Sequence, residues 1–294
     1  MNLAMNALPR VALGPHQVSR LIVGGNPLSG NSHQGKERDR EMTDWFTCAR
    51  TKQMLHRCEE EGINTIQARG DAHITRLLNE YWNEGGKIQW IAQTASEIGD
   101  FGANVRRILQ FNPIAVYHHG TKADNLWFER KVDELRDRLQ FLRDNVPVVG
   151  LGTHLPEVVQ YSEEHEWPVD FYMTCAYAIS RKERPLFFTV GHHGGWEQYD
   201  DQDRAAMCRL IRQVQKPCLA FKILGAGRKC ATTEDVRAAF EFTFNNIKPT
   251  DAVVVGMFPK DRDQVSENAA IVRAICSSLA PPSAEPCGCN PNIV

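Results

Sequence analysis

A short apolar segment followed by an amphipathic segment recurs eight times along this chain of 294 residues. The apolar segments are nearly continuous hydrophobic runs, which is typical of parallel strands that are covered on both faces. The amphipathic segments carry apolar residues at helical spacing. Eight strand–helix units of this size fit a closed barrel better than an open sheet. We therefore predict an α/β fold, an eight-stranded parallel (TIM) barrel.

The boundaries of the repeat follow from the apolar runs and from the glycine and proline residues between them. The predicted strands are residues 19–25, 63–68, 88–94, 114–120, 146–154, 169–177, 216–225 and 251–257. The predicted helices are residues 40–62, 73–86, 102–111, 125–144, 156–166, 200–215, 233–247 and 263–279. We expect one barrel domain over residues 1–280, and a flexible tail over residues 281–294 that contains Pro and a Cys-Gly-Cys sequence.

Composition narrows the classes of function. The chain has 34 Lys and Arg against 36 Asp and Glu, for a net charge of −2, which argues against nucleic-acid and polybasic membrane partners. No apolar run approaches the roughly 20 residues of a membrane span, and the N-terminus lacks the apolar core of a signal peptide. We expect a cytoplasmic protein that acts on a small-molecule substrate. The sequence leaves its oligomeric state open.

Polar side chains occur where the predicted strands end, and in TIM barrels reacting groups lie at the C-terminal ends of the strands. Asn26, Gln67 and Gln93 are candidates for binding substrate hydroxyl groups, although they could also be hydrogen-bonded structural amides. The candidate catalytic residues at or near strand ends are Arg69, Asp71, His118, His119, His154 and Lys222. Strand alternation places Gln67, Arg69 and Asp71 on one side, and an Arg69–Asp71 ion pair at the rim is the structural alternative.

The histidines suggest two kinds of chemistry. His119 and His154 follow adjacent strands, so one could act as a general base and the other as an acid. They could instead share a divalent metal ion with Asp71, a weak signal because no metal-binding spacing is present. Lys222 lies in an otherwise apolar strand, where it could hold an anion or, with a lowered pKa, act as a base. A rim lysine paired with a carboxylate is the alternative.

Several segments resemble the aldo-keto reductase family. The resemblance rests on LGPHQVSRLIVGGNPLSG, EEGINTIQARGD, VVGLGTHLPEVV, AFKILGAGR and DAVVVGMFPKDRDQVSENAAIV, and covers about residues 10–279. It implies an aldo-keto reductase-like barrel. It also implies that Lys222 cradles a pyrophosphate and that an NADP cofactor, if bound, contacts Gly225, Gly227, Lys260, Arg262, Gln264 and Asn268.

The catalytic residues of that family are not preserved. Gln67 stands where the family has Asp, the tyrosine region reads Arg69 to Ala72, and Gln93 or Thr94 replaces the lysine. Only the fourth-strand histidine remains, as His118 or His119. Without the acid tyrosine and its lysine, ketone reduction has no evident proton donor. We therefore favour a non-redox lyase, dehydratase or isomerase that acts on a sugar-derived or hydroxy-carbonyl compound. A divergent NADP-dependent oxidoreductase and a non-catalytic binding protein are the alternatives.

Overall fold

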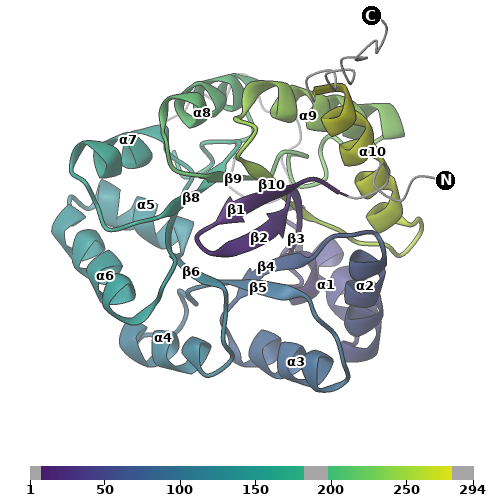
Figure 1. Cartoon of the computed structure of the whole chain (residues 1–294), viewed down its shortest axis with the longest axis horizontal. Helices are drawn as coiled ribbons and strands as arrows, with labels where there is room; N and C mark the ends of the chain where they lie inside the picture. Colours follow the sequence, from purple (N-terminus) through teal and green to yellow (C-terminus); the bar gives the residue numbers. More distant parts are fainter. Residues whose placement is uncertain (1–7, 182–197, 280–294) are drawn as a thin grey trace, which may run out of the picture.

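Eight parallel strands close into a barrel in the computed structural model, which describes residues 8–181 and 198–279 (Figure 1). The order around the barrel is β10-β3-β4-β5-β6-β7-β8-β9, so each strand lies beside its neighbour in the sequence and the last lies beside the first. The prediction of a TIM barrel is confirmed. The barrel strands are β3 Leu21–Gly24, β4 Thr65–Arg69, β5 Gln89–Gln93, β6 Ala115–His118, β7 Val149–Thr153, β8 Phe171–Cys175, β9 Cys218–Phe221 and β10 Ala252–Gly256.

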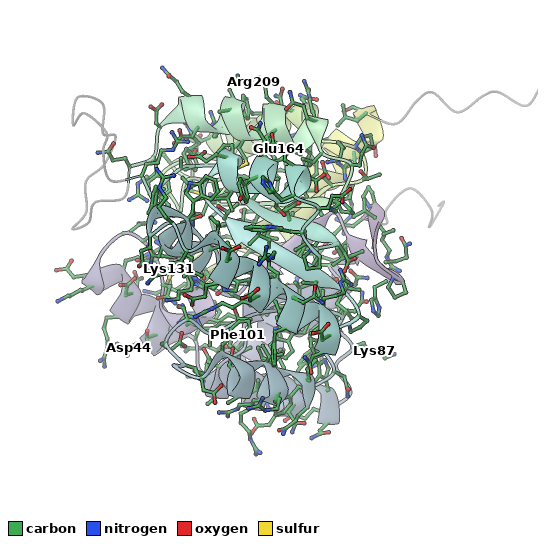
Figure 2. All side chains as sticks on the ribbon, turned by 90° about the vertical axis from the view of Figure 1, so that its left-hand side faces the viewer. Asp44, Lys87, Phe101, Lys131, Glu164 and Arg209 are labelled. Atoms are coloured by element: carbon green, nitrogen blue, oxygen red, sulfur yellow. The ribbon has the colours of Figure 1, made fainter. Side chains whose placement is uncertain are left out.

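A ring of helices covers the outside of the barrel (Figure 1). In α3, Ile74, Leu77, Leu78 and Tyr81 are buried at helical spacing, and they present one apolar face to the strands. Exposed charged side chains such as Arg209 and Glu164 lie on the outer surface of this layer (Figure 2). The α-helices are α1 Lys36–Trp45, α2 Cys48–Glu60, α3 Ala72–Asn83, α4 Phe101–Leu109, α5 Gly120–Phe128, α6 Val132–Asn145, α7 Pro156–Glu164, α8 Asp201–Gln213, α9 Thr233–Asn246 and α10 Gln264–Leu279; the 3-10 helix η2 is Pro27–Ser29.

Two predicted helices are each divided in the structure. The expected helix over residues 40–62 breaks at Phe46 and Thr47, because the Thr47 side chain accepts a hydrogen bond from the Arg50 amide and begins α2. The expected helix over residues 125–144 becomes α5 and α6. Arg130 has a left-handed backbone (φ 59°) between them, so helical geometry cannot continue through this residue. The charge pattern of these segments is helical throughout and does not reveal either break.

An N-terminal hairpin that the sequence did not predict closes the end of the barrel opposite to the site described below. Its strands are β1 Arg10–Leu13 and β2 His16–Ser19, paired antiparallel. The hairpin lies across the near end of the barrel in Figure 1. Its side chains Val11, Leu13 and Val18 pack with residues at the start of the barrel strands. Within the described ranges, the N-terminal end of the barrel is therefore filled by apolar side chains.

Some expectations concern residues outside the described ranges. The tail over residues 281–294, with its Cys-Gly-Cys sequence, is one of them. Within residues 8–181 and 198–279, no helix is both long enough and apolar enough to cross a membrane.

Candidate active site at the C-terminal end of the barrel

The strand register brings inward-facing polar residues together at the C-terminal end of the barrel. Arg69 pairs with Gln93 across β4 and β5, and Gln93 pairs with Tyr117 across β5 and β6. Paired residues of parallel strands point to the same side of the sheet. His119 and His154 follow β6 and β7 by one residue. We refer to this end, around Arg69, Gln93, His119 and His154, as the mouth.

His154 is held by a buried carboxylate. Nδ1 of His154 lies 2.6 Å from Oδ2 of Asp124, which is itself fully buried in α5. The Asp124 carboxylate also accepts hydrogen bonds from the hydroxyl groups of Thr153 and Ser180, and the oxygen–oxygen distance is 2.5 Å in each. With Nδ1–H donated to Asp124, Nε2 of His154 is the nitrogen that carries a lone pair, and it has no partner in the described part of the chain. This arrangement orients an imidazole as a base.

The contact between His154 and Asp124 requires that the backbone of β7 pass close to the start of α5. A Cβ atom on Gly152 in β7 would lie 2.9 Å from the carbonyl oxygen of His118 and 3.1 Å from the amide nitrogen of Gly120. Only glycine therefore fits where β7 passes the start of α5. Asp124 lies in the second turn of α5, where its carboxylate reaches the end of β7.

His119 is a neutral imidazole at physiological pH. It is the N-cap residue of α5, and its Nδ1 accepts a hydrogen bond from the Lys122 amide over 3.4 Å. Burial lowers the pKa of His119 to about 3. The positive charges of Arg69 and Lys222 lower this pKa further. Because Nδ1 is an acceptor, the proton is on Nε2, which makes His119 a hydrogen-bond donor toward the mouth.

His118 does not belong to the mouth, and the expectation of a catalytic role for it is wrong. It points outward from β6 into the helix layer, with 1% of its surface exposed and its ring 5.7 Å from that of Phe101. Neither ring nitrogen has a hydrogen-bond partner among the described residues. Burial lowers its pKa to about 3. Adjacent strand residues face opposite sides of a sheet, so only one of the two consecutive histidines faces the mouth.

Asp71 is also not part of the site. Its carboxylate accepts a hydrogen bond from the Ile74 amide over 2.8 Å and caps α3. The ion-pair partner of Arg69 is Glu97, at 3.2 Å, rather than Asp71. Among residues 8–181 and 198–279, no group of three or more His, Cys, Asp or Glu side chains could hold a metal ion. The predicted metal site of His119, His154 and Asp71 is therefore not formed.

Two predicted polar residues converge on a tyrosine that was not among the predicted site residues. The side-chain amides of Gln67 and Gln93 each donate a hydrogen bond to the Tyr117 hydroxyl group, with Nε2 at 2.7 Å from the hydroxyl oxygen. Tyr117 is buried in the barrel interior, below the mouth. Its position two residues before His119 was a signal for the same inward face, because strand side chains alternate.

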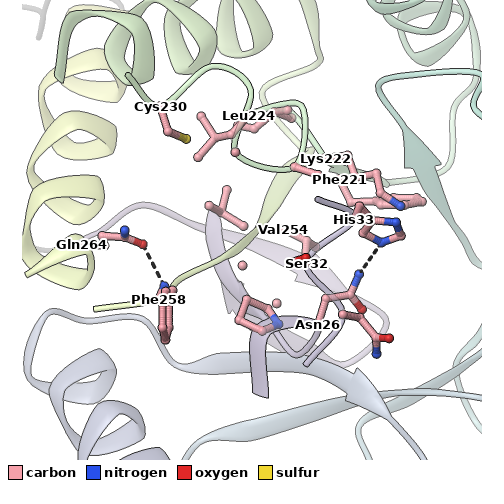
Figure 3. Close-up of a pocket in the computed structure, with 18 of the residues that line it drawn as sticks. Asn26, Ser32, His33, Phe221, Lys222, Leu224, Cys230, Val254, Phe258 and Gln264 are labelled. Carbon is pink, nitrogen blue, oxygen red and sulfur yellow. Dashed lines mark hydrogen bonds between the residues drawn. The ribbon is translucent and has the colours of Figure 1, made fainter. Parts of the chain in front are cut away.

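A cavity of about 330 Å³ opens beside the mouth, between the segments that follow β3, β9 and β10 (Figure 3). Asn26, Gln67, Phe221 and Lys222 line it on the side of the barrel axis. Phe221 connects the cavity with the histidines, because its ring lies 5.5 Å from that of His154. The cavity is therefore adjacent to the mouth at Phe221. In TIM barrels, the loops after strands seven and eight frequently bind ligands at this place.

Lys222 lies between the cavity and the mouth. Its ammonium group lies 5.7 Å from the centre of the Phe221 ring, and no carboxylate within the described ranges forms an ion pair with it. The expected alternative of a rim lysine paired with a carboxylate is therefore not observed there. Its backbone is left-handed (φ 58°), which is unfavourable for a residue with a side chain. The loop thus holds a cation that has no carboxylate partner among the described residues, in a strained backbone conformation, at the entrance of the cavity.

The residues expected to contact NADP have different positions. Gly227, Arg262, Gln264 and Asn268 line the cavity, whereas Gly225 and Lys260 do not. Lys260 forms an ion pair with Glu41 at 2.7 Å, and Arg262 forms one with Glu267 at 2.9 Å. The side-chain oxygen of Gln264 accepts a hydrogen bond from the Phe258 amide (Figure 3). Asn268 is 5% exposed, and its side chain has no hydrogen-bond partner among the described residues. Its side-chain amide therefore lines the cavity without a bond to the described residues.

Comparison with known proteins gives the fold. No protein-family model matches the chain, and no curated protein matches it. It is similar to the solved structure of Gox0644 in its apo form, with a TM-score of 0.55, 9% identity, and coverage of 92% of this chain and 94% of the other. It is also similar to a dihydropteroate synthase of Xanthomonas albilineans, with a TM-score of 0.54, 11% identity, and coverage of 94% and 99%. At such identities the similarity supports the TIM-barrel fold alone.

These comparisons correct the expected family. The aldo-keto reductase subtype is not supported, because no family model matches and the similar structures include dihydropteroate synthases. The segments that carried the resemblance are strand ends and glycine-containing turns, and closing any eight-stranded parallel barrel favours such sequences. The prediction of the fold class stands without the subtype.

Proposed function

We propose that the chain is an acid–base enzyme in which His154, oriented by Asp124, moves a proton on a small anionic carbonyl compound. The observation that supports this most directly is the 2.6 Å contact between the two side chains, with the carboxylate fully buried. A carboxylate on Nδ1 fixes the tautomer and stabilises the imidazolium that forms when Nε2 accepts a proton. The reaction class is that of a lyase, dehydratase or isomerase acting on a hydroxy-carbonyl or sugar-derived substrate.

The groups around His154 suit proton removal next to a carbonyl group. When Nε2 takes a proton from the carbon beside the carbonyl, negative charge develops on the carbonyl oxygen. The neutral His119 donates a hydrogen bond from Nε2, and the charges of Arg69 and Lys222 stabilise that oxygen. The proton on His154 then returns to a neighbouring carbon or to a leaving hydroxyl group. The remainder of the substrate occupies the adjoining cavity, where Asn26 and Asn268 offer polar groups.

Deuterium exchange tests the proposal even while the product is unidentified. The protein is incubated in D2O with a panel of hydroxy-ketones, hydroxy-aldehydes and keto acids that carry a carboxylate or phosphate group. Proton NMR then follows the loss of the hydrogen next to the carbonyl. We expect exchange into at least one compound, and a fall of about a hundredfold or more in the His154→Asn variant, the size of a general-base contribution.

A matched control separates the proposed base from other histidines. His73 lies exposed on α3, outside the mouth, so His73→Asn is expected to retain the full exchange rate. Equal exchange by wild type and His154→Asn would overturn the assignment of the base. If members of the panel bind but none exchanges a proton, the chain is a binding protein, the alternative considered from the sequence.

A further inference from the structure

The hydroxyl group of Tyr117 occupies the floor of the mouth and is held from two sides. Gln67 in β4 and Gln93 in β5 donate side-chain N–H groups to the Tyr117 oxygen, each over 2.7 Å. The tyrosine is 2% exposed. Below it, the barrel is filled by apolar side chains such as Phe171. The only polar space next to this hydroxyl group, within the described part of the chain, is therefore the mouth above it.

Tyr117, Gln67 and Gln93 together offer hydrogen-bond donors to a ligand. A phenol oxygen has two acceptor positions and one hydrogen, and the two glutamines use both acceptor positions. No acceptor among the described residues takes the hydroxyl hydrogen. The three side chains together hold five N–H and O–H hydrogens, of which the two internal bonds use two. A buried donor that lacks a partner costs free energy. The remaining three hydrogens of Tyr117, Gln67 and Gln93 would therefore be stabilised by an acceptor atom of a ligand.

The surrounding charge fits an acceptor that is negative. Arg69 is close enough to Tyr117 and to His119 to lower the pKa of both groups. Burial nevertheless raises the pKa of Tyr117 well above its ordinary value. The hydroxyl group therefore keeps its proton and acts as a donor at all working pH values. The register of β4, β5 and β6 places Arg69, Gln93 and Tyr117 on the same side of the sheet. A neutral phenol, a neutral imidazole and a guanidinium group, the last ion-paired with Glu97 at 3.2 Å, are therefore the groups near a ligand in the mouth.

We propose that Tyr117, positioned by Gln67 and Gln93, donates its hydroxyl hydrogen to an oxygen of a planar anionic ligand, such as a carboxylate or the enolate of a keto acid. This rests on the proposed function and deepens it, because the oxygen concerned is the one on which charge develops when His154 removes a proton. A planar anion places one oxygen on Tyr117 and leaves a second oxygen for His119 and Arg69. We choose a planar anion rather than a tetrahedral phosphate group because the enolate formed next to the carbonyl group in the proposed reaction is planar.

Oxalate is the probe, because it is a planar dianion that resembles an enolate of a keto acid. We expect calorimetric titration to show that oxalate binds wild-type protein more tightly than inorganic phosphate does. Tyr117→Phe removes one hydrogen bond to a charged group, for which about a tenfold loss of affinity or more is expected. In protein labelled with 13C at the tyrosine ζ carbon, oxalate is expected to shift the resonance that disappears in Tyr117→Phe.

Two further variants make the test specific. Gln93→Glu replaces an N–H donor with a carboxylate that accepts the Tyr117 hydroxyl hydrogen and repels an anion, so oxalate binding is expected to be lost. This variant also decides the question if Tyr117→Phe does not fold. Tyr81→Phe is the matched control: its hydroxyl group is buried in α3 without a partner among the described residues. It is expected to bind oxalate like wild type.

The outcomes also separate this subsite from the proposed reaction. His154→Asn is expected to keep oxalate binding that depends on Tyr117 even though proton exchange falls, so the subsite stands if the assignment of the base fails. Oxalate affinity that is unchanged in both Tyr117→Phe and Gln93→Glu overturns the subsite, whatever the activity. Failure of wild-type protein to bind oxalate, or tighter binding of phosphate than of oxalate, also overturns it.

Discussion

Asp124 accepts the Nδ1 hydrogen of His154 over 2.6 Å although the two residues are 30 positions apart in the sequence. One comes from the second turn of α5 and the other from the residue after β7. The contact joins a helix that follows one barrel strand to the end of the next strand. The hydroxyl groups of Thr153 and Ser180 and the backbone amide of His154 also donate hydrogen bonds to the carboxylate. Both the activity and the stability of the protein are therefore expected to depend on this one buried carboxylate.

The variant Asp124→Asn is expected to lose both activity and stability. The amide cannot accept hydrogen bonds on both sides, so at least one of the Thr153, Ser180 and His154 donors is left without a partner. A lost bond to a buried charged group costs about 1.5–3 kcal/mol of unfolding free energy. Proton exchange should fall about a hundredfold or more, because the imidazole tautomer is no longer fixed. Urea unfolding measures the loss of stability, and proton NMR in D2O measures the loss of exchange.

Asp251→Asn is the control for that variant. Asp251 is likewise fully buried but precedes β10 at the opposite end of the barrel, where it accepts a hydrogen bond from the Cys218 amide. It is expected to lower stability while leaving the exchange rate of the folded protein unchanged. A large loss of exchange in Asp251→Asn would mean that general destabilisation, and not the His154 contact, explains the first result.

The free energy of unfolding is expected to fall as the pH drops from about 6.5 toward 3, in part because of His118 and His119. Burial lowers the pKa of His118 from 6.5 to about 3 in the folded protein. Between these values the unfolded chain binds the proton and the folded chain does not, so acid favours unfolding. The contribution of one such histidine is about 1.4 kcal/mol per pH unit.

Replacing His118 with Leu isolates this effect. The substitution removes two buried nitrogens that lack partners among the described residues. Relative to wild type, the unfolding free energy of His118→Leu should improve by about 2 kcal/mol between pH 7 and pH 5. Urea titrations at the two pH values measure it. Parallel pH profiles for the two proteins would show that His118 binds a proton equally in both states. Proton exchange at the mouth should not change, because His118 faces the helix layer.

Lys222→Gly and Lys222→Ala separate the charge of Lys222 from its backbone strain. Glycine adopts the left-handed conformation of this residue (φ 58°) freely, so Lys222→Gly is expected to gain up to about 1 kcal/mol of stability. Alanine keeps the strain and should show no gain. Both variants remove the cation and should weaken oxalate binding, which calorimetry measures. Unchanged affinity in both would exclude an anion-binding role of Lys222.

Gly152→Ala is expected to disturb the active site through the backbone alone. Its new methyl group would lie 2.9 Å from the His118 carbonyl oxygen, which forces β7 and the start of α5 apart. We expect a loss of about 1–3 kcal/mol in stability and a slower proton exchange. Gly99→Ala is the control, since a Cβ at Gly99 meets nothing within 4 Å. Equal stability of the two variants would show that the close approach is relaxed in solution.

The repeat of apolar strands and amphipathic helices was sufficient to predict the barrel from the sequence. Each strand buries both faces and each helix buries one, and these periods are local properties of the chain. The same periodicity identified Gln67, Gln93 and His154 as residues at strand ends. It failed where a local cap or turn interrupts a helical pattern, as at Thr47 and Arg130. It also did not predict the hairpin that closes the other end of the barrel.

Tertiary structure alone decided which of these residues act together. Because side chains alternate along a strand, the sequence predicts that His118 and His119 face opposite sides of the sheet. Only the register of β6 in the closed barrel determines that His119 is the one that faces the mouth. Asp71 follows the mouth-facing Arg69 in sequence, yet its carboxylate is taken by the start of α3. Asp124 has no local pattern that marks it, because its partner lies on the next strand. A buried charge is stabilised by donors that the fold collects from distant positions, and such a set cannot be read from spacing along the chain.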